Sequence, residues 1–253
     1  MALGSWCWFD LNTTDIEAAK AFYKAVIGWD ILGVEAPDGG YAMWANGDAG
    51  VGGLMLLPEQ AKAMGAPPSW VGYVEVADAD TMAARVQALG GTLYAPVTVI
   101  DGGRGRFFVF ADPQGAVAAC YESPQGPSAD PPLAPGFWSW SELGTSDGGA
   151  ALAFYTELFG WKAGTAMDMG PGGIYQMYGK TVEGRGLGGI FTKGPGMGPP
   201  AWLHYFRVAD LDIACAAVTA GGGEIVNGPM QVPSGEHIVQ ARDPQGAFFA
   251  LVA

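Results

Sequence analysis

The amino-acid sequence predicts an α+β fold built from two similar halves. The first observation is an internal repeat, because Trp8-Phe9-Asp10-Leu11-Asn12-Thr13-Thr14-Asp15 returns 132 residues later as Trp140-Ser141-Glu142-Leu143-Gly144-Thr145-Ser146-Asp147. The second is that segments of strand and helix periodicity alternate in each half. The third is a seam rich in Pro, Gly and Ser, which cannot sustain a helix or a central strand. We therefore predict a first domain at 1–122, a linker at 123–134 and a second domain at 135–253.

Other short stretches repeat in the same order, so chance cannot explain the duplication. The paired stretches are Ala21-Phe22-Tyr23 with Ala153-Phe154-Tyr155, Gly28-Trp29 with Gly160-Trp161, Tyr41-Ala42-Met43-Trp44 with Tyr175-Gln176-Met177-Tyr178, Gly52-Gly53 with Gly188-Gly189, Pro67-Pro68-Ser69-Trp70 with Pro199-Pro200-Ala201-Trp202, and Asp112-Pro113-Gln114-Gly115-Ala116 with Asp243-Pro244-Gln245-Gly246-Ala247.

Each half is predicted to contain two βαβββ-like units. In the first unit, residues 6–12 read as a strand, Asp15 as a helix N-cap, and the residues up to Gly28 as a helix. Residues 41–44 and 52–56 read as the next strands. In the second unit a strand at 70–76 and a helix at 80–89 precede strands near 92–99, 105–111 and 116–121. The Asp-Pro-Gln-Gly segment between the last two strands is typical of a hairpin turn.

Composition and charge exclude several classes of function. Hydrophobic residues make up 49% of the chain, which allows a sizeable core. The net charge of −13 disfavours nucleic-acid partners and docking on anionic membranes. No apolar stretch approaches the roughly 20 residues needed to span a bilayer, and no secretory signal is visible. The three widely spaced cysteines suggest reduced thiols, so we expect a cytoplasmic protein.

The repeated motifs resemble those of a known superfamily. A strand ending in Thr-Thr-Asp, a helix with Phe-Tyr, a following Gly-Trp and an Asp-Pro-Gln-Gly-Ala turn resemble the vicinal oxygen chelate superfamily of glyoxalases, bleomycin-resistance proteins and extradiol dioxygenases. The matches cover nearly the whole chain, as in tandem-domain bacterial members. The resemblance implies two glyoxalase-like domains, each with paired βαβββ modules that form concave half-barrel sheets.

The resemblance also implies where metal ligands would stand. Metal-binding members place His or Glu on the first strand of each module and on the last strand of the second module. In this chain those positions are Trp8, Val71 and Ala119 in the first half, and Trp140, Leu203 and Ala250 in the second. None of these side chains offers a donor that a divalent ion prefers. A register slip of one residue brings in His204 but no complete ligand set, so we expect neither a metal nor another cofactor.

The first strands carry the leading site candidates. Trp8 and Trp140 either wall a pocket for a flat ligand or fill the space that a metal would occupy. Asp10 and Glu142 share their face by the period of two, so each is a candidate general base or anchor for a cationic group. The alternative is that each carboxylate is a buried partner for Arg207, Arg106 or a Tyr hydroxyl.

The remaining candidates lie on the second modules. Tyr73 and Tyr205 are candidate pocket hydrogen-bonders, with catalytic roles if there is a reaction. Glu75 and Arg207 occupy equivalent places with opposite charge, so the two sites should differ in ligand. Arg106 and its counterpart His237 are suited to a carboxylate or phosphate, and a surface position near a turn is the alternative. His204, on the apolar-face register, is interpreted as a structural residue.

Three functions are compatible with this sequence. The first is a metal-free binding protein for a small aromatic or cationic molecule. The second is a lyase, isomerase or dioxygenase of the glyoxalase type. It would use Asp10 or Glu142 as base with support from Tyr73, Tyr205 or Arg207, or a metal held by unconventional ligands. The third is a structural or interaction protein without a ligand. We expect a monomer with pseudo-twofold domain pairing or a homodimer.

Overall fold

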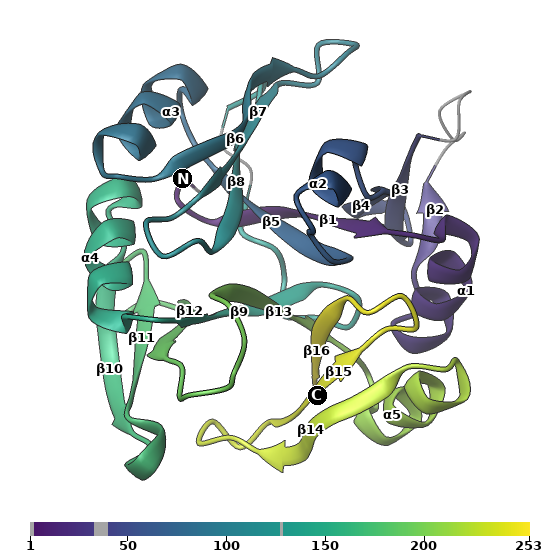
Figure 1. The fold of residues 1–253 in the computed structure, drawn as a ribbon. Helices are drawn as coiled ribbons and strands as arrows, with labels where there is room; N and C mark the ends of the chain where they lie inside the picture. Colours follow the sequence, from purple (N-terminus) through teal and green to yellow (C-terminus); the bar gives the residue numbers. More distant parts are fainter. Residues whose placement is uncertain (1–2, 33–39, 127–128) are drawn as a thin grey trace. The chain divides into compact units, whose positions relative to one another are not determined.

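The computed structural model describes residues 3–32, 40–126 and 129–253, and both halves show the same order of strands and long helices (Figure 1). The first half contains β1 Trp6–Thr13, α1 Ile16–Val26, β2 Asp30–Leu32, β3 Tyr41–Asn46, β4 Ala49–Leu56, α2 Glu59–Ala63, β5 Ser69–Glu75, α3 Ala79–Ala88, β6 Thr92–Val99, β7 Arg106–Ala111 and β8 Val117–Glu122. The second half contains β9 Trp138–Thr145, α4 Gly148–Phe159, β10 Lys162–Asp168, the 3-10 turn Gly170–Gly172, β11 Ile174–Gly179, β12 Gly186–Thr192, β13 Ala201–Arg207, α5 Leu211–Ala220, β14 Glu224–Gln231, β15 His237–Arg242 and β16 Phe248–Val252.

Four aspartates start the four long helices in the same way. The side chain of Asp15 accepts a hydrogen bond from the backbone N–H of Ala18 at the start of α1, as the sequence predicts. Asp78, Asp147 and Asp210 cap α3, α4 and α5 with the same spacing of three residues. Each cap satisfies a backbone donor that the first helical turn would leave without a partner.

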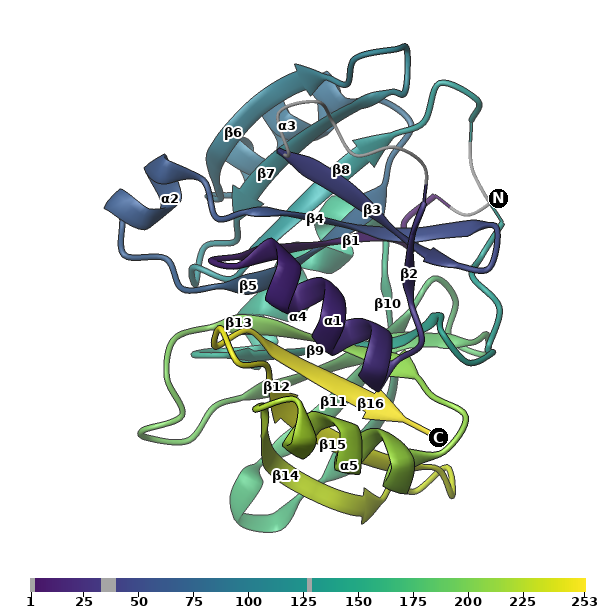
Figure 2. The ribbon, with the colours of Figure 1, turned by 90° about the vertical axis from the view of Figure 1, so that its right-hand side faces the viewer.

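The strands of each half form one open sheet of eight strands, which confirms the predicted α+β class. The strand orders are β2-β3-β4-β1-β5-β8-β7-β6 and β10-β11-β12-β9-β13-β16-β15-β14. Within every module the first and last strands pair in parallel, and the hairpins are antiparallel. The helix of the module packs on the same strands, so that α3 lies behind β6, β7 and β8 in Figure 2. The parallel register places Asp10 opposite Gly53 and Glu142 opposite Gly189.

The sequence pattern missed two short elements, β2 and α2. They contain three and five residues, which is too short for the period of two of a strand or the period of 3.6 of a helix to be recognised. The predicted linker includes Pro127 and Ser128, which lie outside the described residues. The predicted domain boundaries at 122 and 135 stay a prediction. No helix in the described part of the chain is long and apolar enough to cross a membrane.

The backbone folds into two compact units that do not follow the sequence halves. Unit 1 comprises Met1–Cys7, Gly72–Asp130 and Trp140–Leu203, and unit 2 comprises Trp8–Val71, Pro131–Ser139 and His204–Ala253. Each unit therefore combines the first module of one half with the second module of the other. In unit 1, for example, α3 lies next to α4 (Figure 1). Arg85 of α3 donates hydrogen bonds to the backbone oxygen and the carboxylate of Glu157 on α4.

A buried chain of hydrogen bonds joins the two modules of unit 2. Trp70 Nε1 donates to the Tyr23 hydroxyl at 3.0 Å, and that hydroxyl donates to Oδ2 of Asp243 at 3.0 Å. The other carboxylate oxygen accepts from the backbone N–H groups of Gln245 and Ala247, which closes the Asp-Pro-Gln-Gly turn. Burial raises the pKa of the Asp243 carboxyl and raises that of the Tyr23 hydroxyl well above its usual value. Three of the repeated motifs thus meet at one structural contact.

Unit 1 contains the same arrangement with the roles of the halves exchanged. Trp202 Nε1 donates to the Tyr155 hydroxyl at 3.1 Å, and that hydroxyl donates to Oδ2 of Asp112 at 3.1 Å. The Asp112 turn is closed by the N–H groups of Gln114 and Ala116 at 2.9 Å. The tyrosine on the first helix of each half therefore donates to the turn aspartate of the opposite half. The repeat of these motifs at the same spacing in both halves is thus explained by the packing of one half's first module against the other half's second module.

Removing either buried hydroxyl should destabilise the protein. In Tyr155→Phe and in Tyr23→Phe, a buried Trp N–H and an Asp oxygen lose their shared partner, so we expect the free energy of unfolding to fall by about 1–3 kcal/mol in each. Urea unfolding measures the loss. Tyr94→Phe is the matched control, because Tyr94 is 45% exposed and its change should cost little. Unfolding midpoints equal to that of the unmodified protein would contradict a structural role for these hydroxyls.

Candidate functional site

Three side chains of unit 2 form a polar and aromatic cluster on β1 and β3. Trp8 Nε1 donates a hydrogen bond to Oδ1 of Asp10 at 2.8 Å, and the Tyr41 hydroxyl donates to the same oxygen at 2.9 Å. The indole N–H also lies 3.0 Å from the Tyr41 oxygen. Asp10 is 5% exposed, whereas both aromatic rings are half-buried. The cluster thus places a carboxylate beneath two aromatic surfaces that remain partly open.

Glycines on the neighbouring strand β4 make room for this cluster. A Cβ on Gly53 would overlap the Tyr41 hydroxyl and the Asp10 carboxylate, so only glycine fits opposite Asp10. A Cβ on Gly50 would lie 3.3 Å from the Trp8 ring. The repeated Gly-Gly motif is therefore explained by side-chain packing on one face of the sheet.

The equivalent cluster of the second half lies in unit 1. Trp140 Nε1 donates to the Tyr175 hydroxyl at 2.9 Å, and the Tyr175 ring stacks on Phe191 with centroids 6.2 Å apart. A Cβ on Gly189 would overlap the Tyr175 ring, as at Gly53. Glu142 stands opposite Gly189 in the register, where the first half has Asp10. The second cluster therefore keeps the aromatic pair and has a carboxylate that is longer by one methylene.

Tyr73 and Glu75 lie on β5 and are almost fully buried. Tyr73 is 9% exposed and its ring packs against Phe107 with centroids 6.1 Å apart. Glu75 is 1% exposed, and its charge contributes to the raised pKa of the Cys7 thiol, for which burial is the larger cause. Burial also raises the pKa of Cys120, so neither thiol is suited to act as a nucleophile.

Tyr205 and Arg207 lie on the same face of β13 in unit 2. The Tyr205 hydroxyl accepts a hydrogen bond from Nε2 of Gln240 at 2.8 Å. Arg207 contacts Ser139 and Glu236. Tyr205 stands opposite Ala250, whose small side chain takes little space on the adjacent strand. The charge contrast that the sequence predicts thus becomes a buried Glu75 in one unit and a largely buried Arg207 in the other.

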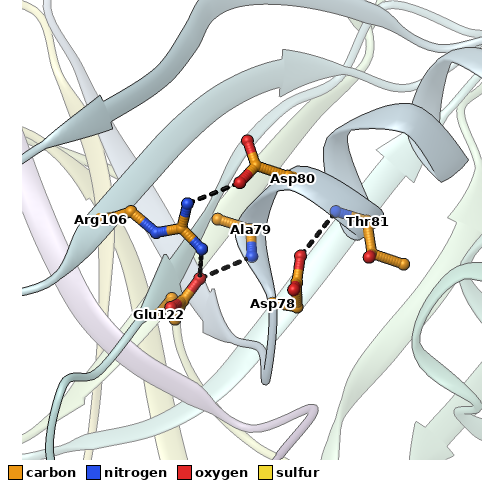
Figure 3. A network of polar contacts seen from close by, with 6 residues as sticks. All are labelled: Asp78, Ala79, Asp80, Thr81, Arg106 and Glu122. Carbon is orange, nitrogen blue, oxygen red and sulfur yellow. Dashed lines mark hydrogen bonds and ion pairs between the residues drawn. The ribbon is translucent and has the colours of Figure 1, made fainter.

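Arg106 stabilises the start of a helix (Figure 3). Its guanidinium donates to the carboxylates of Glu122 and Asp80, and Glu122 also accepts the backbone N–H of Ala79 at 2.8 Å. These two carboxylates hold the pKa of Arg106 above its usual range. Its counterpart His237 is exposed on β15, with its backbone paired to Ala253. The two residues therefore occupy equivalent positions but different surroundings.

The residues at the positions of the implied metal ligands do not suit a divalent ion. The parallel register of β5 and β8 places Ala119 opposite Tyr73, and that of β13 and β16 places Ala250 opposite Tyr205. Trp8 and Trp140 use their only polar atom, Nε1, as a donor. Within the described ranges, no three His, Cys, Asp or Glu side chains are grouped so that they could hold a metal ion.

A hollow in the described part of the chain lies away from these strands. It has a volume of about 280 Å³ and is formed by the Asp243 turn and the start of β14, with Glu224 and Arg242 at its rim. These two side chains form an exposed ion pair with each other. Because the hollow is open and shaped by a structural turn, we place the candidate site at the aromatic clusters instead.

Sequence reasoning did not assign Tyr41 and Tyr175 to the site. Their motif repeats between the halves, but a tyrosine that starts a strand is equally typical of a core position. The signal that could have identified them is the Gly-Gly motif, because each tyrosine covers the second glycine of its half. Ser139, Glu236 and Gln240 were also missed, since no motif marks them.

Comparison with known proteins gives consistent results. A family model described as Glyoxalase/Bleomycin resistance protein/Dioxygenase superfamily matches residues 7–118 and 139–251. A Mycobacterium bovis protein named "Putative glyoxylase CFP32" is 34% identical over 248 residues, covering 97% of this chain and 93% of that protein. The "Anthracycline biosynthesis protein DauV" of Streptomyces sp. (strain C5) is 31% identical over 268 residues, covering 99% of this chain and 94% of that protein.

Solved structures show the same fold at lower sequence identity. The Mn(II)-bound glyoxalase from Novosphingobium aromaticivorans has a TM-score of 0.70 at 18% identity, with 99% of this chain and 82% of that chain covered. The 2,3-dioxygenase LapB from Pseudomonas sp. KL28 has a TM-score of 0.68 at 14% identity, with 100% and 93% covered.

Proposed function

Because this chain belongs to the Glyoxalase/Bleomycin resistance protein/Dioxygenase superfamily, we propose that it binds a small aromatic or cationic molecule without the help of a metal ion. The proposed site is the cluster of Trp8, Asp10 and Tyr41. The cluster of Trp140, Glu142 and Tyr175 is the corresponding site of the second half.

The observation that carries the proposal is the Asp10 carboxylate held beneath two half-buried rings. The two hydrogen bonds from Trp8 and Tyr41 orient the carboxylate, and a carboxylate favours a ligand with a cationic group. The faces of indole and phenol rings attract cations and stack on flat molecules. A cationic aromatic compound would therefore use both parts of the cluster.

The relatives narrow the choice of ligand to be tested. One relative is named for anthracycline biosynthesis, and anthracyclines are planar aromatic compounds. We therefore expect the site to accept a flat, fused-ring molecule more readily than an aliphatic one. Doxorubicin, a cationic anthracycline, combines the two features that the cluster would recognise.

Metal-free binding can be tested with a cationic and a neutral benzyl compound, which differ in charge, and with doxorubicin. Protein dialysed against EDTA is titrated with benzylamine, benzyl alcohol and doxorubicin while tryptophan fluorescence and thermal unfolding are followed. A probe at a hundred times its Kd should stabilise the protein by about 2.7 kcal/mol. Asp10→Asn keeps an oxygen that can accept from Trp8 and Tyr41 but removes the charge, so benzylamine should bind about tenfold more weakly, a loss of about 1.4 kcal/mol.

Two comparisons decide the outcome of this test. The affinity for benzyl alcohol should change little in Asp10→Asn. Asp48→Asn changes an exposed carboxylate and should leave the affinity for all three probes unchanged. Absence of binding by every probe would contradict the proposal and favour a structural or interaction role. Binding that returns only after a divalent metal is added would contradict the metal-free site.

A glyoxalase-type reaction is the second candidate function. It is favoured by the fixed orientation of the Asp10 carboxylate, which the Tyr41 hydroxyl holds at 2.9 Å, since a general base must be positioned to accept a proton from a bound substrate. In this role Asp10 or Glu142 would remove a proton, with Tyr73 or Tyr205 in support. Conversion of methylglyoxal and glutathione by the EDTA-dialysed protein, lost in Asp10→Asn, would favour this function over binding alone.

A further inference from the structure

Arg207 is the last residue of β13, and its guanidinium forms hydrogen bonds with the described part of the chain through Nη2 but not through Nε. Its Nη2 donates to Oγ of Ser139 at 3.2 Å and to the carboxylate of Glu236. Nothing among the described residues accepts a hydrogen bond from its Nε, although that atom is buried. The side chain of Arg207 is only 15% exposed, so most of its surface is covered by protein.

An ion pair with a purely structural role would be expected to satisfy the buried Nε of Arg207, and this one does not. Nε and Nη2 lie on the same edge of the guanidinium, and a carboxylate bound side-on accepts from both. Glu236 accepts only from Nη2 and leaves the buried Nε without an acceptor. A buried donor without a partner is costly, so native proteins rarely keep one without a reason. The edge of Arg207 is therefore shaped for a better-placed carboxylate than Glu236.

Glu236 can leave Arg207 at little cost. It follows the tip of the β14–β15 hairpin, where Gly235 adopts a φ of +91° with open space around it. The side chain of Glu236 is 39% exposed, and its second oxygen accepts from Ser234 Oγ at 3.1 Å. When another carboxylate takes the place of Glu236, the Arg207 charge stays paired and the released Glu236 is solvated, so the exchange changes stability only slightly. A dissolved carboxylate can therefore reach Arg207 from the side that Glu236 now covers.

We propose that Arg207 is a binding site for the carboxylate of a small molecule, with Glu236 occupying the site until that molecule displaces it. The incoming carboxylate accepts from Nε and Nη2 together, which satisfies the buried donor. Ser139 keeps its contact and holds the guanidinium in place. This inference does not depend on ligand binding at Trp8 and Asp10.

The first half of the chain cannot form such a site. Glu75 stands 132 residues before Arg207, at the equivalent place on β5, and is 1% exposed. A buried carboxylate repels an anionic ligand, so the duplicated module has opposite charge preference at this position. The Arg207 site is thus a feature of the second half alone, which makes the first half an internal reference.

The test uses benzoate as the probe and the N–H resonance of Arg207 Nε as the readout. The resonance is assigned by its loss in Arg207→Lys. Glu236→Gln removes the competing charge while keeping the size of the side chain. We expect benzoate to shift the Arg207 resonance and to bind Glu236→Gln about fivefold to tenfold more tightly than the unmodified protein. Benzyl alcohol, which has the ring but no carboxylate, should not shift it.

A second ion pair in unit 2 supplies the matched control. Arg242 pairs with Glu224, and both side chains are about half-exposed, at 47% and 59%. Glu224→Gln frees an arginine in the same way but without the buried edge, so it should not change benzoate binding. The proposal is overturned if Glu224→Gln and Glu236→Gln tighten binding equally, or if benzoate leaves the Arg207 resonance unmoved in Glu236→Gln. The Arg207 Nε resonance reports binding at Arg207 itself, which separates this result from binding at the Trp8 site.

Discussion

Acidification from pH 6.5 to about pH 4.5 should cost the protein about 2.3 kcal/mol of stability through His204 alone. This residue is 1% exposed on β13, and its ring meets that of Phe9 edge-on with centroids 4.9 Å apart. Burial lowers its pKa from 6.5 to about 3, because the apolar surroundings disfavour the charged imidazolium. The folded protein therefore keeps His204 neutral in a range where the unfolded chain takes up a proton.

The direction of the effect follows from proton binding. With the pKa lowered in the folded state, the contribution of His204 is fully present above pH 6.5 and is lost as the pH falls toward 3, by about 1.4 kcal/mol per pH unit. Asp112 and Asp243 act in the opposite direction, because burial raises their pKa values above 3.8. Their contribution is greatest below pH 3.8 and declines as the pH rises through their folded pKa values.

Urea unfolding at a series of pH values separates these contributions. In His204→Leu the carboxylates remain and the histidine does not titrate, so the loss of stability on acidification should be much smaller than in the unmodified protein. His237→Leu is the control, because His237 is exposed on β15 in the same unit. Equal pH slopes for His204→Leu and the unmodified protein would show that His204 can be protonated in the folded state.

Gly188→Ala should be strongly destabilising, because a Cβ at Gly188 makes the closest approach to its neighbours among the glycines that the structure describes. A Cβ at this position of β12 would overlap the backbone oxygen of Ser141 and the ring of Tyr178. Backbone cannot give way as a flexible side chain can, so β12 and β9 would have to separate. The Tyr178 hydroxyl also donates to Ser141 O at 3.1 Å and accepts from Trp6 Nε1 at 3.0 Å, and both bonds would be strained. We expect a loss of about 3 kcal/mol or more.

The equivalent glycine of the first half should respond in the same way, and a glycine on β10 serves as a control. Gly52→Ala would place a Cβ against the backbone oxygen of Phe9 in unit 2, and should have a similar effect. Gly164→Ala on β10 would meet Met177 at 3.6 Å, an ordinary contact, and should change stability little. Circular dichroism and urea unfolding measure all three. A Gly188→Ala protein as stable as Gly164→Ala would contradict the close approach of β9 and β12.

Much of the candidate site could be predicted from the sequence because its residues share a strand. Asp10 follows Trp8 by two, so a strand places both on one face, and the cluster confirms this placement. Tyr41 joins them from another strand, at a distance along the chain that periodicity does not describe. The surroundings of Arg106 were also hidden, since Asp80 and Glu122 reach it from a helix and a different strand.

The amino-acid sequence by itself determined the duplication, the α+β modules, the capping aspartates and the absence of metal donors at the implied ligand positions. These features depend on residue identity and on short spacings, which local geometry translates directly into structure. Only the tertiary structure decided that Tyr23 bonds to Asp243 rather than Asp112, and that Glu236 covers Arg207. The two halves carry the same motifs, so choosing between equivalent partners required the packing of modules that lie far apart in the chain.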